Sequence, residues 1–347
     1  MMIKNKLALA VMVAGISTQV SAVELGEFNG TTFSVGGYIK GEAIIDRPDD
    51  VAKTAYGDDD SFDSTARQSR VNFKASKSVE GHKLTGFVEG DFYGSGSTSY
   101  DWRLRHAYMQ VDNLTVGQTW NGQFWTNAPF DVEILDFFGT GVGSFAGSGA
   151  VVRPDLVVHY TTGGFRFTAQ DPLYADADIP DLVAAYTYRA KSGHAVNIAV
   201  SGREVETDPA ASDSEFGVSL QLSGKFKFGN TSVAAGAFSG EGGAVYAGWG
   251  DDVDASNDLT TTTGFYAGIS QKFSPKLRGN LRYGQVESDE IVREGEDTVR
   301  MTNVNLIYTY VPGLDFGIEW RDRSATTIPT GLRTAGQQIE VMAMYKF

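Results

Sequence analysis

The chain has 347 residues, a formal net charge of −14, 41 glycines, 12% aromatic residues and no cysteine. This composition excludes the disulfide frameworks that brace small secreted domains and the basic footprint of a nucleic-acid-binding protein. No segment beyond the first 22 residues has the length and apolarity of a transmembrane helix, so a place in a membrane would require strands.

The first 22 residues have the three parts of a secretory signal peptide. Lys4 and Lys6 give a positive start, residues 7–16 form a short apolar run, and residues 20–22 are a small-residue cleavage site. A single membrane anchor would need about 20 apolar residues, and the polar residues 17–19 interrupt the run too early. The sequence therefore predicts a signal peptide over 1–22 and one domain over 23–347.

The remaining chain alternates apolar and polar residues with a period of two, which is typical of strands. In residues 33–43, 277–283 and 314–321, one face is apolar and the other is polar or charged. Leu314, Phe316 and Ile318, for example, lie on the face opposite Glu319. The sequence predicts an all-β protein.

The connections between these strands alternate between short and long. The short turns contain typical turn residues at 78–81, 112–113, 163–164, 192–193, 229–230, 274–275 and 312–313. The long polar connections are residues 46–64, 94–101, 121–150, 172–181, 204–214, 241–260, 287–298 and 324–334. This rhythm predicts about sixteen strands in a transmembrane antiparallel β-barrel of the outer-membrane type.

A soluble β-sandwich or β-helix would also alternate, but it would bury one face in a dry core. Here the polar face carries Lys40, Arg103 and Arg321, which would be costly to bury. The last predicted strand ends on Tyr345 and Phe347, as expected for an interfacial aromatic girdle. Both features favour the barrel.

The order of several motifs resembles that of the DcaP-like porins of Gram-negative bacteria. The matching segments are FSVGGYIKGEA at 33–43, SRVNF at 69–73, FVEGDFYG at 87–94, LRHAY at 104–108, VGQTW at 116–120 and IPDLVAAYTY at 179–188. This resemblance implies a homotrimeric channel of sixteen strands that passes small anions such as dicarboxylates. It also implies that the strand ending in Phe347 is the signal for the barrel-assembly machinery.

The third long connection, residues 121–150, carries several aromatic residues, which is unusual for a loop surrounded by solvent. The resemblance implies that this loop folds into the lumen as a constriction. Its acids Asp131, Glu133 and Asp136 are then candidates to face a basic wall. The alternative is a surface flap whose acids are merely solvated.

The acidic residues are concentrated in the long connections, and the rest of the chain carries more bases than acids. Because Arg or Lys facing lipid costs about 2–4 kcal/mol at the bilayer midplane, these bases should line the pore and attract anions. The candidate pore-lining bases are Arg70, Lys74, Arg103, Arg105, Arg278 and Arg282. The alternative is that acids of the same wall neutralise them, namely Glu42, Glu89, Asp91 and Glu319.

One predicted strand, residues 100–111, does not alternate cleanly. If Arg103 and Arg105 face inward, regular alternation places His106 and Gln110 outward, which would suit a subunit seam on this side of the barrel. A β-bulge that switches the phase is the other explanation.

The sequence favours no enzyme, because its four histidines show no nucleophile or metal-binding spacing. We expect no cofactor and no dedicated metal site, although the acidic runs near residues 57–63 and 250–258 could hold Ca²⁺ loosely. The predicted function is an outer-membrane porin for small hydrophilic solutes, favouring small anions. Its expected partners are membrane lipid and lipopolysaccharide, the assembly machinery and two further copies of the chain, with no nucleic acid. The alternatives are a non-conducting adhesin or structural barrel acting through its acidic loops, and a barrel hydrolase.

Overall fold

In the computed structural model, the described residues are 22–49, 59–94, 101–123, 130–135, 153–173, 177–247, 251–288, 298–324 and 336–347. The predicted signal peptide falls almost wholly outside them. The elements are β1 (Val23–Phe28), β2 (Thr31–Pro48), β3 (Ser61–Thr65), β4 (Arg70–Val79), β5 (His82–Asp91), β6 (Arg103–Val111), β7 (Leu114–Gln118), β8 (Val157–Thr162), β9 (Phe165–Gln170), β10 (Asp181–Arg189), β11 (Ala195–Asp208), β12 (Asp213–Phe228), β13 (Thr231–Glu241), α3 (Ala244–Ala247), β14 (Thr261–Lys272), β15 (Leu277–Ser288), β16 (Thr298–Val311), β17 (Leu314–Ser324) and β18 (Gly336–Lys346).

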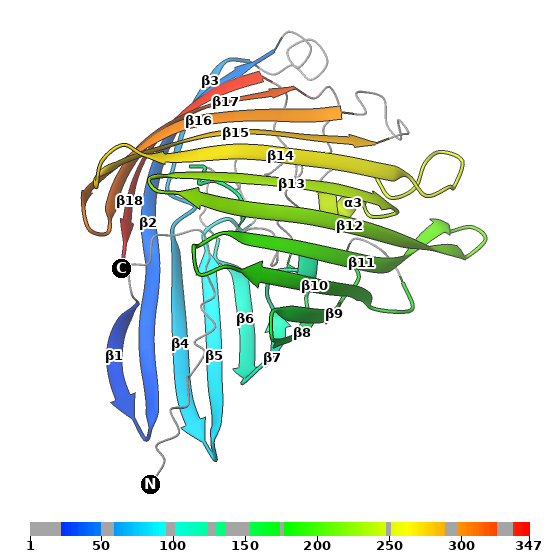
Figure 1. Cartoon of the computed structure of the whole chain (residues 1–347), viewed down its shortest axis with the longest axis horizontal. Helices are drawn as coiled ribbons and strands as arrows, with labels where there is room; N and C mark the ends of the chain where they lie inside the picture. The colour runs from blue at the N-terminus through cyan, green and yellow to red at the C-terminus, as the bar shows by residue number, and fades with distance from the viewer. Residues whose placement is uncertain are drawn as a thin grey trace.

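Sixteen of these strands close into one antiparallel barrel (Figure 1). The ring runs from β2 to β4 and on through β18, which pairs antiparallel with β2 and so closes it. Phe347 completes the seam, because its backbone N–H and C=O bond to Gly37 at 3.1 and 3.0 Å. The short strands β1 and β3 pair with the two ends of β2 as additions to the ring. The predicted barrel is therefore confirmed.

The predicted short turns are confirmed as the hairpins β4–β5, β6–β7, β8–β9, β10–β11, β12–β13, β14–β15 and β16–β17. Several need a positive φ, as at Asp112 (50°) and Gly163 (55°), which explains their Asn, Asp and Gly content. A further hairpin joins β1 to β2, with positive φ at Asn29 and Gly30.

The two faces of the wall differ as the alternation predicted. Leu281 and Ile318 are each 49% exposed on the outer face, whereas their neighbours Arg282 and Glu319 are fully buried on the inner face. Outward apolar residues continue around the ring, so the barrel carries the apolar outer band of a protein of the bacterial outer membrane. In the described residues, no helix is both long enough and apolar enough to span a bilayer.

Strand β6 contains the β-bulge that irregular alternation allowed. His106 lies opposite Glu89 while Leu104 lies opposite Gly90, so Arg105 is the extra residue in the ladder. Arg105 and His106 are consequently both buried, and Leu104 is exposed on the outer face. The expectation that His106 faces outward at a subunit seam is therefore wrong, because the bulge reverses the phase.

Candidate functional site

Residues 130–135 of the third long connection run across the inner face of the barrel. Phe130, Val132 and Leu135 are buried. Val132 packs against Ala234 and Tyr266, and Leu135 against Ile307 and Met342. These partners belong to β13, β14, β16 and β18, so the segment follows the wall inside the lumen. A loop surrounded by solvent would not bury these side chains.

The two described acids of this segment face arginines of the wall. Asp131 lies 2.9 Å from Arg282 on β15. Glu133 accepts two hydrogen bonds of 2.8 Å from Arg278, the paired geometry that a guanidinium fork favours. Asp136, the third acid expected here, lies outside the described residues.

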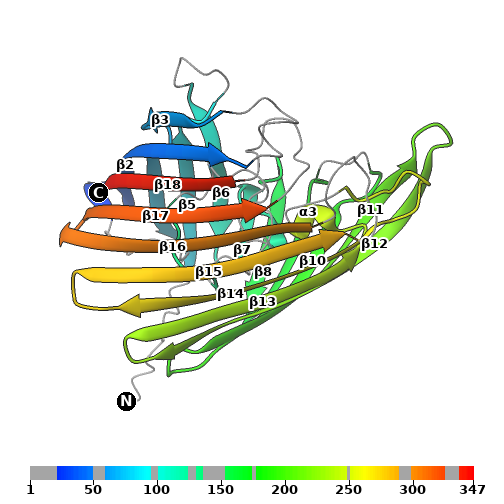
Figure 2. The ribbon, with the colours of Figure 1, turned by 90° about the horizontal axis from the view of Figure 1, so that it is seen from above.

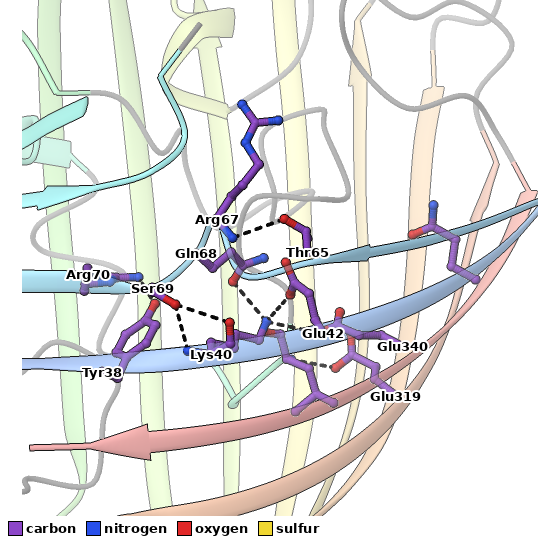
Figure 3. Close-up of polar contacts among 12 residues, drawn as sticks. Tyr38, Lys40, Glu42, Thr65, Arg67, Gln68, Ser69, Arg70, Glu319 and Glu340 are labelled. Atoms are coloured by element: carbon purple, nitrogen blue, oxygen red, sulfur yellow. Dashed lines mark hydrogen bonds and ion pairs between the residues drawn. The ribbon is translucent and has the colours of Figure 1, made fainter. Parts of the chain in front are cut away.

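Lys40 on β2 anchors the far end of the segment (Figure 3). Its ammonium donates to the Leu135 carbonyl at 2.8 Å and to Gln68 at 3.0 Å. It also lies 2.6 Å from Glu42 and 2.9 Å from Glu340. Because Lys40 is 1% exposed, these bonds replace its hydration almost completely. The sequence marked Lys40 as inward-facing but did not indicate that it holds the loop.

Strands β4, β5 and β6 form a second charged wall. Arg105 bonds to Glu89 at 2.9 Å and to Asp91 at 2.8 Å. Arg103 lies 2.7 Å from Asp91, and Arg70 lies 3.4 Å from Glu89. Three guanidinium groups thus share two carboxylates. Arg103 and Arg105 both reach Asp91, so they lie on the inner face together, as residues two apart in a strand do.

The structure also places the other expected pore-lining bases. Arg278 and Arg282 form ion pairs with the acids of segment 130–135. Lys74 is exposed and forms no hydrogen bond or ion pair within the described residues. Five of the six candidate bases therefore face carboxylates, which agrees with the alternative that acids neutralise them. The acids that face Arg278 and Arg282, however, are not the ones named in that alternative.

Arg153 adds a positive charge to the β4–β6 wall that sequence reasoning missed. It precedes β8, and its guanidinium lies over Trp120 at 4.9 Å from the ring centre. Burial, helped by Arg105 and Arg103, lowers the Arg153 pKa to about 9, so it remains charged at neutral pH. Its Nε and Nη1 are buried without a hydrogen-bond partner in the described part of the chain. Trp120 in the motif VGQTW was visible, but its basic partner lies 33 residues further along the sequence.

A second basic cluster lies at the turn end of the inner wall. Arg189 is in register with Ala195, which faces Lys225, so these side chains share one row across β10, β11 and β12. Arg189 lies over the Phe130 ring at 5.5 Å, and Lys225 donates to the Asp131 carbonyl at 2.7 Å. In the described residues neither base forms an ion pair with a carboxylate. Both bases instead contact segment 130–135, through the Phe130 ring and the Asp131 carbonyl.

The buried histidines of the lumen are engaged in hydrogen bonds. Two buried histidines bond to threonine hydroxyls, His106 to Thr119 at 3.0 Å and His159 to Thr168 at 2.7 Å. No group of three potential metal ligands occurs among the described residues. What the arrangement offers is a narrowed lumen with fixed charges of both signs.

Neither the protein-family models nor the curated proteins contain a match to this chain. Solved structures do match. The outer-membrane channel DcaP of Acinetobacter baumannii has a TM-score of 0.78 at 23% identity, covering 93% of this chain and 99% of that one. An anion-selective porin from Comamonas acidovorans has a TM-score of 0.67 at 14% identity, covering 91% and 100%.

A third similar structure is OmpF of Salmonella typhi, with a TM-score of 0.66 at 13% identity, covering 92% of this chain and 98% of that one. The resemblance to DcaP-like porins inferred from the motifs is confirmed at the level of the fold. Sixteen closed strands, an apolar outer band and the inward-lying segment 130–135 give this chain the fold of the bacterial outer-membrane porins.

Proposed function

We propose that the protein is a water-filled outer-membrane channel for passive diffusion of small hydrophilic solutes, with a preference for small anions set at the β4–β6 wall. The observation that supports the preference is the excess of bases there. Among the described residues, Arg70, Arg103, Arg105 and Arg153 face the carboxylates of Glu89 and Asp91.

This excess matters because the β15 part of the wall is closely balanced. Arg278 and Arg282 are matched by the acids of segment 130–135 and by Asp315. An ion passing the narrow region therefore meets a net positive field from one wall. In a narrow aqueous path between walls of low dielectric constant, such a field concentrates anions.

Arg153 offers the cleanest test, because among the described residues no acid is hydrogen-bonded to it whose charge its removal would expose. One unit charge about 7 Å from a passing ion is worth roughly 0.6 kcal/mol in water, or a two- to threefold change in local anion concentration. Because the same charge repels potassium, we expect Arg153→Gln to lower the permeability ratio of chloride to potassium by the square of that factor, roughly four- to ninefold. The measurement is the reversal potential across a planar bilayer in a salt gradient.

Lys191→Gln is the matched control, since Lys191 is an exposed base in the β10–β11 turn. It should leave the reversal potential unchanged. The shift for Arg153→Gln should shrink at high salt, where fixed charges are screened. An unchanged reversal potential at low salt would contradict the anion preference. A barrel that carries no current would contradict the channel itself and favour an adhesin or structural barrel.

The remaining expectations belong to this proposal. A cleaved signal peptide over 1–22, a homotrimer, contact with lipopolysaccharide and delivery through the barrel-assembly machinery are all consistent with the fold. One similar structure is described as a trimer form of OmpT of Vibrio cholerae. Mass spectrometry of the exported protein and native gel electrophoresis would test the cleavage site and the trimer.

A further inference from the structure

The connection between β13 and β14 was expected to be an acidic outer loop, but its helix lies inside the barrel. Figures 1 and 2 place α3 within the ring of strands. Tyr246 of this helix is 1% exposed and packs with Leu173, Phe238 and Val286. A second segment, besides residues 130–135, therefore occupies the lumen.

Glycines at the end of β13 let this connection lie close to the wall. Gly240 and Gly243 both face Ser219 on β12, and a Cβ added to them would lie 2.1 and 1.8 Å from the Ser219 hydroxyl oxygen. Gly242 has a φ of +60°, a backbone conformation that glycine adopts without steric cost. The local sequence therefore suits a chain that turns inward after β13, and a larger residue at 243 would hold it away from β12.

Polar contacts fix the helix to several further strands. The Tyr246 hydroxyl donates to Asp181 on β10 at 2.7 Å and accepts a hydrogen bond of 3.1 Å from Gln170 on β9. Asp252, in the same connection, lies 2.6 Å from Arg203 on β11. The contacts of this connection thus extend from β9 to β15, so α3 bridges an arc of the wall instead of following one strand.

The two segments inside the lumen lie at different depths. On β13, segment 130–135 packs against Ala234, whereas α3 packs against Phe238. On β15, the same two segments contact Arg282 and Val286. On both strands the α3 contact lies four residues closer to the long connections, about 13 Å along a strand. A solute that crosses the barrel therefore passes the two segments one after the other.

The two levels of the lumen differ in their chemistry. Segment 130–135 carries acids that form ion pairs with Arg278 and Arg282. Helix α3 has the sequence AVYA, which contains no charged residue, and Tyr246 packs with apolar side chains. Helix α3 therefore narrows the lumen by its volume, whereas segment 130–135 also brings fixed charges.

We propose that α3 is a size filter in series with the charged constriction. It narrows the lumen at the level of the long connections and sets the largest solute that passes, while the wall around Arg153 sets the preference for charge. This inference rests on the proposed channel function. It concerns the described residues 240–247 and 251–260.

Swelling of protein-containing vesicles in neutral sugars measures the size limit. Tyr246→Ala removes the bonds to Asp181 and Gln170 and the apolar packing, without changing a formal charge. We expect the swelling rate in a trisaccharide, relative to that in a pentose, to increase severalfold. Tyr246→Phe keeps the packing and should give a smaller increase. Tyr188→Ala is the matched control, because Tyr188 is 55% exposed on the outer face of β10, and it should keep the wild-type ratio.

The reversal potential in a salt gradient separates size from charge. Tyr246→Ala should leave the reversal potential unchanged, because it alters no charged side chain. Arg153→Gln should shift the reversal potential and keep the wild-type ratio of swelling rates. The two variants should therefore have opposite effects on the two measurements.

An engineered disulfide tests the position of the connection, since the chain has no cysteine of its own. The Cβ that Gly243 would gain lies 3.1 Å from the Ser219 Cβ, slightly less than the usual distance of about 3.5–4.5 Å in disulfides. Ser219→Cys with Gly243→Cys should therefore lose its free thiols on oxidation with copper phenanthroline. In a variant that also carries Tyr246→Ala, this disulfide should restore the wild-type ratio of swelling rates, and dithiothreitol should increase the ratio again.

The outcomes separate this proposal from the channel function. Absence of both current and swelling in every sugar would overturn the channel. A conducting barrel in which Tyr246→Ala gives the same ratio of swelling rates as Tyr188→Ala overturns the size filter and leaves the channel intact. The same holds if the two cysteines do not join in the folded barrel, or if Tyr246→Ala shifts the reversal potential as far as Arg153→Gln does.

Discussion

Replacing Lys40 with methionine should destabilise the barrel more than any substitution of an exposed lumenal base. Methionine keeps the length of the side chain but removes its charge and its donors. In the protein these donors serve Glu340, Gln68 and the Leu135 carbonyl, and the charge lies 2.6 Å from Glu42. The variant therefore removes one buried cation from a cluster of buried acids and frees the end of segment 130–135.

The structure sets the size of the effect. The side chains of Glu42 and Glu340 are both fully buried, so water does not restore their lost partner. Removing one member of a buried ion pair costs about 3–5 kcal/mol in other proteins. Arg321 still contacts Glu340 at 2.8 Å, which places the expected loss at the lower end, about 3 kcal/mol of unfolding free energy.

Urea unfolding of the purified barrel in lipid vesicles measures this difference. Lys74→Met is the matched control, because Lys74 is an exposed base on the inner face with no bonded partner in the described chain. It should change the unfolding free energy by less than about 0.5 kcal/mol. Adding Glu340→Gln to Lys40→Met should restore part of the loss, since the two residues interact directly.

Equal unfolding free energies for Lys40→Met and Lys74→Met would refute the anchoring role. Conductance gives an independent check. Because Lys40 holds the Leu135 carbonyl, its loss should increase current fluctuations in the open channel. Steady currents identical to those of the wild type would show that segment 130–135 is held without Lys40.

Three further predictions concern the wall. Spin labels at Leu281 and Ile318, on the outer face, should be more accessible to oxygen in a bilayer than labels at the buried Asn280 and Glu319, and the reverse order would invalidate the assigned faces. Gly117→Ala should lower the free energy of unfolding by more than about 1 kcal/mol, because φ is +137° and the added Cβ would lie 2.3 Å from the Ala107 carbonyl oxygen. Gly86→Ala, which has open space at its Cβ, is the control. Equal urea midpoints for the two variants would contradict this prediction. The double variant Arg103→Gln with Asp91→Asn removes one charge of each sign. The reversal potential of this double variant should therefore shift less than that of Arg153→Gln. A larger shift would place the selective charge at Arg103.

The strand pattern was readable from the sequence because a barrel wall has two environments. The outer face contacts lipid and the inner face contacts water and polar groups. Every second residue of a strand therefore faces the same environment and has the same chemical character. The turns were readable because positive φ at Asp112 and Gly163 selects particular residue types. The barrel closure followed from counting these local signals, and no long-range contact was needed to infer it.

In strand β6, the local sequence did not determine which residues face inward. Residues 103–111 are compatible with a regular strand or a bulged one, and the choice depends on Glu89 and Asp91 of the neighbouring strand. Those acids bond to Arg105 and Arg103, which share one face in either arrangement, and the bulge places His106 opposite Glu89 on that face as well. Pairing between strands, which the sequence does not display, decided the phase.

The charge of the pore shows the same division. The residue pattern alone indicated a basic wall and acidic long connections. The bases of the strands were assigned to the inner face because a charged side chain that faces lipid is too costly. Which base meets which acid was decided by tertiary structure: Asp131 reaches Arg282 across 151 positions of the chain, and Lys40 reaches Glu340 across 300. Folding of residues 130–135 into the lumen brings the first pair together, and pairing of β18 with β2 brings the second pair together. Ion pairing falls off so steeply with distance that only the folded chain fixes how much of the positive charge remains.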